Sequence, residues 1–99
     1  MDPQIDLRAA RPADFEPHVG SEFRADDRGI TLELVEVKRY GVQPNAPRAE
    51  AFSLYFIGEP GIPQGILAVR HAALGRLEVL VVPIGPGPDG RHRYEAAFN

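Results

Sequence analysis

AFSLYFI at residues 51–57 and LEVLVVPI at residues 77–84 are the two stretches that decide the fold. A strand with one face on the core and the other in water alternates apolar and polar side chains with a period of two. Neither stretch alternates cleanly, because apolar side chains occupy both faces. A chain of 99 residues has little further protein to cover the second face. We therefore expect a partner surface to cover part of it.

Short apolar runs separated by turn residues indicate a single antiparallel β domain. Ten glycines and ten prolines lie mostly between these runs, where they favour turns. One or two helical turns are expected at residues 12–20, because Pro12 suits a helix start and Gly20 the position beyond its end. Phe15 and Val19, four residues apart, would share the buried side of this helix. The fold class is all-β: a small antiparallel β-barrel or sandwich of about six strands with a short N-terminal helix. The expected strands are residues 21–26, 30–40, 51–57, 66–71, 77–84 and 91–98.

The strand expected at residues 30–40, ITLELVEVKRY, changes phase part-way along. Leu32 and Leu34 would share one face, whereas Val35 and Val37 would share the other. A β-bulge produces such a slip and bends the strand at the corner of a barrel or sandwich. We therefore expect a bulge within this strand.

The domain organisation is simple. Residues 1–11 are expected to be a flexible lead-in, although Ile5 and Leu7 could tuck against the core, and residues 12–99 form a single domain. The predicted core is Phe15, Phe23, Leu32, Leu34, Phe52, Leu54, Phe56, Leu67, Val69, Leu77, Val79, Val81, Tyr94 and Phe98.

The opposite faces of the same strands carry a second set of apolar side chains. This set is the predicted protein interface: Tyr55, Ile57, Ile66, Leu80 and Val82. If it is an interface, Leu80→Glu or Ile57→Glu should dissociate the assembly without unfolding the chain.

Composition and charge exclude several classes of function. The chain is 43% hydrophobic and 25% charged, which is the range of globular proteins. Its net charge of −3 offers no basic surface for nucleic acid or an anionic membrane. The absence of cysteine excludes disulfides, thiolate catalysis and cysteine-based zinc sites. The N-terminus lacks the features of a Sec signal peptide, and no apolar run has the roughly 20 residues of a spanning helix. We therefore expect synthesis in the cytoplasm. The sequence does not determine where the protein finally acts, and a particle or fibre is one such place.

No combination of side chains predicts an active site, and we expect no enzyme, no cofactor and no metal. His71 is in phase with Leu67 and Val69, so it should point inward and bond to backbone. The three histidines share no metal-ligand spacing. Ser21 and Ser53 lack the GxSxG context of a nucleophile.

Aromatic and basic residues suggest two further hypotheses about function. Residues 38–40 and 91–94 place basic side chains beside tyrosines, as nucleic-acid-binding barrels do, but the acidic balance argues against nucleic acid. Tyr40, Tyr55 and Tyr94 could instead stack on a small molecule or a carbohydrate. A carbohydrate-binding or small-molecule-binding β module is therefore the alternative function.

A series of motifs in fixed order suggests a family. FEPHVGSEF, LELVEV, AFSLYF, PQGILAVRHAALG, LVVPIG and RYEAAFN follow one another from Phe15 to the C-terminus. This order resembles an uncharacterised bacterial family of small domains, often encoded beside phage tail-collar-like proteins of the kind first described as microcystin-dependent. The resemblance implies an accessory or structural part of a phage-tail-like or fibre-like assembly. The family has no established activity, so the resemblance implies no functional residue. Other members tend to have an aromatic residue after the PQG step where this chain has Leu67, a departure that concerns packing only.

The first hypothesis is therefore a non-enzymatic structural or adaptor protein. It would associate with itself, or with a tail-collar-like or fibre-like protein, through apolar strand faces or edges. A stable interface buries about 800 Å² on each partner, and the five predicted residues would form its centre.

Overall fold

The computed structural model describes residues 10–25, 28–41 and 50–98. All six expected strands and the expected helix are present. Residues 1–9 of the expected lead-in, with Ile5 and Leu7, and residues 42–49 lie outside the described residues. The elements are α1 (Pro12–Phe15), the 3-10 helix η1 (Glu16–His18), β1 (Glu22–Ala25), β2 (Ile30–Gly41), β3 (Ala51–Gly58), β4 (Gly65–His71), β5 (Gly75–Pro86), the 3-10 helix η3 (Pro88–Gly90) and β6 (His92–Phe98).

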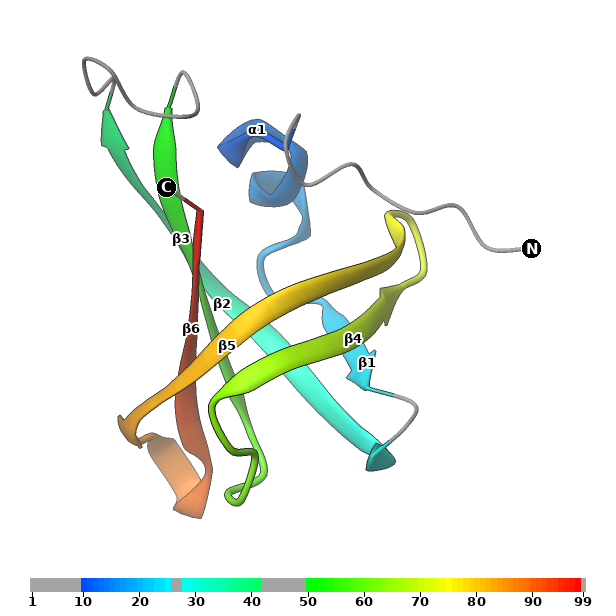
Figure 1. The fold of residues 1–99 in the computed structure, drawn as a ribbon, viewed down its shortest axis with the longest axis vertical. Coiled ribbons are helices and arrows are strands. Elements are labelled where there is room, and N and C mark those ends of the chain that lie inside the picture. The colour runs from blue at the N-terminus through cyan, green and yellow to red at the C-terminus, as the bar shows by residue number, and fades with distance from the viewer. Residues whose placement is uncertain (1–9, 26–27, 42–49, 99) are drawn as a thin grey trace.

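The strands form one antiparallel sheet that closes on itself into a ring. Their order around the ring is β1-β2-β3-β6-β5-β4. Of the two expected architectures, this closed order corresponds to the barrel. In Figure 1 the β4–β5 hairpin runs across the β2–β3 pair, and β6 lies between β3 and β5. Between β1 and β4 the described residues form a single ladder pair, Arg24 opposite Arg70.

β2 contains the bulge that its change of phase predicts. Leu34 pairs with Phe56 and the next pair is Glu36 with Tyr55, so Val35 is the extra residue. Because of this extra residue, Val37 returns to the inner side of the sheet, where it packs partly buried against the core. The bulge thus converts an apparent two-faced strand into one with a continuous inner face.

Every residue of the predicted core is buried.

The helix closes one end of the ring. Phe15 packs against Phe52 and Phe98 with ring centroids 5.9 Å away in each case, and Phe52 stacks on Phe98 at 4.5 Å. Figure 1 shows the helix near the start of β3 and the end of β6, which are neighbours in the sheet. Val19, however, is 46% exposed, so its expected burial is wrong. The backbone is already extended at Val19, and a helical spacing no longer applies there.

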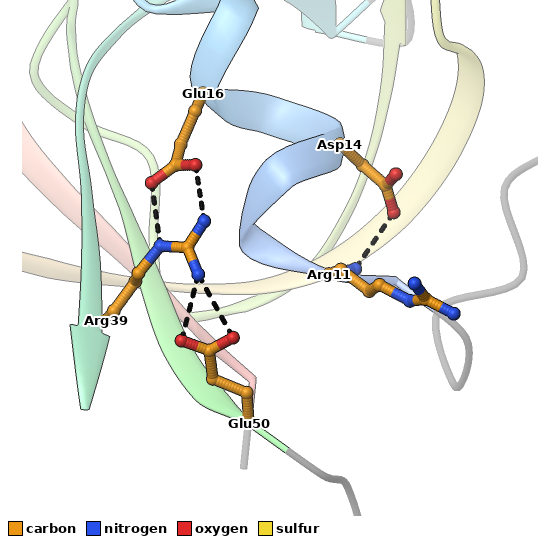
Figure 2. Close-up of polar contacts among 5 residues, drawn as sticks. All are labelled: Arg11, Asp14, Glu16, Arg39 and Glu50. Atoms are coloured by element: carbon orange, nitrogen blue, oxygen red, sulfur yellow. Dashed lines mark hydrogen bonds and ion pairs between the residues drawn. The ribbon is translucent and has the colours of Figure 1, made fainter. Parts of the chain in front are cut away.

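Arg39 ties the helical segment to the sheet (Figure 2). Its Nε and Nη2 donate to the two carboxylate oxygens of Glu16 at 2.9 and 2.6 Å. Its Nη1 donates to both oxygens of Glu50 at 3.1 Å. These groups are exposed, so solvent screens their attraction, but the paired geometry fixes orientation. The hydrogen bonds from Arg39 lower the pKa of Glu16. At the start of the helix, the Asp14 carboxylate accepts the backbone N–H of Arg11 at 2.9 Å.

Tyr94 anchors the connection between β3 and β4. Its hydroxyl donates to the carbonyl of Glu59 at 2.6 Å and accepts the backbone N–H of Ile62 at 3.4 Å. Ile62 is only 3% exposed, although its Pro- and Gly-rich context predicts no more than a turn. The connection therefore adds a side chain to the core that the strand pattern does not reveal.

Gly58→Ala should destabilise the fold by overpacking. A Cβ at this buried β3 position would lie 2.4 Å from Cδ2 of Leu32 and 3.1 Å from the carbonyl oxygen of Thr31. We expect the free energy of unfolding to fall by about 1–3 kcal/mol, measured by chemical denaturation. A variant with the stability of the wild type would show that the Leu32 side chain yields without strain.

Candidate functional site

Four apolar side chains lie at the surface on β4 and β5. Ile66 is directly opposite Leu80 in the ladder, and they are 66% and 49% exposed. Val82, the next outward position on β5, is half-buried, and Ile84 is 42% exposed. Side chains at facing positions of neighbouring strands have Cβ atoms about 4.5–5.5 Å apart. These residues (Ile66, Leu80, Val82 and Ile84) are called the outer patch below, and three of the five predicted interface residues belong to it.

Ile57 does not belong to the outer patch. It is 7% exposed, so the expectation that its side chain is available at the surface is wrong. In the ladder Ile57 lies between Glu33 of β2 and Arg93 of β6. Both neighbours have long apolar stems, and such stems cover apolar surface while their charged ends stay in water.

The fifth predicted residue, Tyr55, lies in a cluster of hydroxyl groups around Glu95. Glu95 pairs with Tyr55 on one side and with Val82 of the outer patch on the other. Its Oε2 accepts hydrogen bonds from Ser53 Oγ at 2.9 Å and from the Tyr55 hydroxyl at 3.0 Å. The Tyr40 hydroxyl donates to Ser53 Oγ at 3.1 Å and lies 3.2 Å from the Tyr55 hydroxyl. The cluster therefore adjoins the outer patch and holds Tyr55 in a fixed position.

The surroundings of Tyr55 favour the protonated form of its hydroxyl. The hydrogen bond with Tyr40, partial burial and the bond to Glu95 together raise the pKa of Tyr55 above its ordinary value. Tyr55 thus remains a hydrogen-bond donor at neutral pH. The ammonium group of Lys38 lies 5.6 Å from the centre of the Tyr40 ring, a cation–π distance.

Tyr94 cannot contribute to a stacking surface. It is fully buried, so the expectation that it joins Tyr40 and Tyr55 at the surface is wrong. The reason is strand alternation, because Tyr94 lies between the outward-facing Arg93 and Glu95 on β6.

His71 points inward and bonds to backbone, as its phase in β4 predicts. Its Nδ1 accepts the backbone N–H groups of Ala73 and Leu74 at 3.0 and 3.2 Å. Nε2 lies 2.8 Å from Ser21 Oγ, and the Ser21 hydroxyl donates to the carbonyl of His18. Two donors at Nδ1 place the ring proton on Nε2, so this nitrogen cannot take a proton from Ser21. The Ser–His pair therefore anchors the chain before β1 to the β4–β5 turn.

The free energy of unfolding should decrease as the pH decreases, because of His71. Burial and the neighbouring His18 lower the pKa of His71 below the ordinary 6.5. The unfolded chain therefore gains a proton at a higher pH than the folded chain, so the stabilisation is complete above this value and is lost as the pH falls below it. We expect lower stability at about pH 5.5 than at about pH 7.5 in urea denaturation, within a range above the titration of Glu16. His71→Gln should flatten the difference, and an equal loss in both proteins would contradict this assignment.

Residues 10–25, 28–41 and 50–98 contain neither a candidate metal site nor a candidate membrane-spanning helix. No three histidine, aspartate or glutamate side chains gather there in a group that could hold a metal ion. None of the helices described is long and apolar enough to cross a membrane.

Comparison with known proteins places the chain in a family. The model of a domain of unknown function, DUF6916, matches residues 10–98. The chain belongs to the DUF6916 family. The DUF6916 match spans the helix and all six strands, and it agrees with the resemblance to an uncharacterised domain family. No curated protein and no solved structure matches the chain.

Proposed function

We propose that this DUF6916 domain is a non-enzymatic structural or adaptor protein that binds another protein through the outer patch. The observation that carries the proposal is the facing pair of Ile66 and Leu80, which are 66% and 49% exposed. Two large aliphatic side chains side by side on a regular strand pair contribute nothing to the core. Such grouped apolar exposure on a small protein typically marks a binding surface.

The surroundings of the outer patch support a protein partner. Interfaces combine an apolar centre with tyrosine and arginine and a polar rim. Tyr55 and Glu95 lie beside Val82 in the same cross-strand row, and Arg93 is the next outward residue of β6. A stable interface needs about 800 Å² from each partner, so the outer patch would be its centre and this row its rim.

The partner is a second copy of the chain or a tail-collar-like or fibre-like protein. The resemblance to domains encoded beside phage tail-collar-like proteins supports the second kind. Tail and fibre subunits join through repeated protein contacts, for which a small rigid domain with one apolar face is suited.

Light scattering after size exclusion tests the proposal. The mass should exceed the 10.9 kDa of one chain in at least one of two samples, the purified chain at high concentration and the chain co-expressed with the tail-collar-like protein of the same genome. A mass of one chain in both samples would overturn the proposal.

A carbohydrate-binding function is the second candidate, and the pairing of Tyr40 with Tyr55 favours it. Their hydroxyls lie 3.2 Å apart beside Ser53 and Glu95, so rings and polar groups meet at one place, as sugar recognition requires. Tyr55→Ala should then abolish binding on a glycan array, whereas Tyr55→Phe, which keeps the ring, should retain part of it. An array without signal for the wild type would remove this candidate.

A further inference from the structure

Two opposite charges lie side by side on the outer face of β6. Arg93 is exposed and Glu95 is half-buried, and strand alternation places both side chains on the same face. Neither forms an ion pair within the part of the chain that the structure describes. Glu95 uses one oxygen to accept two hydroxyl groups, and its other oxygen makes no hydrogen bond to a described residue.

This arrangement is complementary to itself. If a second copy of β6 lies antiparallel across the first, with a two-fold axis at Tyr94, Glu95 faces Arg93 of the second copy. Arg93 then faces Glu95 of the second copy, as two-fold symmetry requires. Sheets that pack face to face cross at about 30°, and these two residues lie next to the axis, where the crossing displaces them least.

The strands on either side of β6 add apolar contacts to the same arrangement. On the β5 side, Val82 pairs with Glu95 and Gly85 pairs with Arg93. The two-fold axis therefore brings Val82 of each copy near Ile84 and Gly85 of the other. Both aliphatic side chains belong to the outer patch, and Ile84 is 42% exposed.

On the β3 side the contacts are aromatic and then polar. Tyr55 of one copy would lie over the position of Ile57 in the other, because these residues pair with Glu95 and Arg93. Further out, Glu36 would face Glu33. This contact is like-charged, and Arg91, 3.6 Å from Glu33, offsets it at the rim.

We propose that the chain forms a two-fold dimer in which the outer faces of β6 cross and Glu95 of each copy pairs with Arg93 of the other. The proposal rests on the proposed function and names its partner as a second copy. The ion pairs give the interface its register, and the outer patch supplies the apolar area around them.

Charge reversal tests the pairing directly. Arg93→Glu places two carboxylates opposite each other on both sides of the two-fold axis. Glu95→Lys places two cations opposite each other at the same positions. Each variant alone should self-associate at least about a hundredfold more weakly than the wild type. Mixed in equal amounts they should associate again, because each variant then meets its opposite charge at both pairs. Sedimentation equilibrium measures the three samples, and thermal melting checks that each variant is folded.

Two further variants complete the design. Glu95→Gln keeps an acceptor for Ser53 and Tyr55 but removes the charge, so it separates the ion pair from the hydroxyl cluster and should weaken association on its own. Arg76→Glu, which reverses a charge on β5 away from the interface, should leave association unchanged.

The outcomes separate this inference from the proposed function. A wild-type dimer that survives Arg93→Glu and Glu95→Lys unchanged would overturn the reciprocal pairing while leaving the outer patch as the interface. A wild type that is monomeric alone but complexed with the tail-collar-like protein would overturn the dimer and support the proposed function. Association that is lost in each variant by itself and restored in their mixture would support the dimer.

Discussion

Replacing Phe52 by alanine is expected to lower the free energy of unfolding by about 3–5 kcal/mol. The Phe52 ring stacks on Phe98 at 4.5 Å and packs against Phe15 of the helix at 5.9 Å. Its removal leaves a cavity at the point where the helix closes the ring. Small domains are stable by only about 5–15 kcal/mol, so the variant should lose a large part of its stability.

Urea denaturation measures this loss, and Val19→Ala is the matched control. Val19 lies in the same segment as the helix but is 46% exposed, so its truncation should change stability by no more than about 0.5 kcal/mol. A Phe52→Ala protein as stable as this control would show that the aromatic cluster does not hold the helix.

Leu80→Glu and Ile57→Glu are expected to have opposite effects, although the sequence predicts the same effect for both. Leu80 is 49% exposed, so its glutamate variant should fold normally and lose the association. Ile57 is 7% exposed, so its replacement by glutamate loses buried apolar area and takes a carboxylate out of water, beside Glu33 in the ladder. Ile57→Glu should therefore lower the melting temperature strongly.

The two variants are compared by thermal melting and light scattering on the same samples. A Leu80→Glu protein that is folded and still associated would remove the outer patch from the interface. An Ile57→Glu protein as stable as the wild type would show that this position opens easily to solvent.

Much of the fold follows from local pattern. The phase slip between Leu34 and Val35 predicts the bulge, and every residue that the alternation of large apolar side chains assigns to the core is buried. These features depend on periods of two residues and on Gly and Pro turns, which neighbouring residues determine. Two residues depart from the local pattern. Ile62 is buried through tertiary contacts of the connection between β3 and β4, and Val19 is exposed because the helix ends before it.

The site was only partly predictable for a related reason. Ile66 and Leu80 are outward positions of their strands, and the sequence alone places them there. Ile57 is equally outward, yet it is buried at a position between Glu33 of β2 and Arg93 of β6, and the sequence does not show which strands become its neighbours. The contact of Tyr55 with Glu95 also depends on the pairing of β3 with β6, forty residues apart in the chain. Strand order and register, rather than residue type, create the cluster.

Photo-crosslinking from position 66 shows whether the outer patch contacts a partner protein. A photoreactive phenylalanine derivative replaces Ile66 in one sample and Glu78 in another. Glu78 is exposed on the outer face of β5 but lies outside the outer patch. Both are irradiated under the condition in which the wild type exceeds the mass of one chain. We expect covalent complexes from position 66 and few or none from position 78. Equal yields from the two positions, or none from position 66, would show that the outer patch is not the interface.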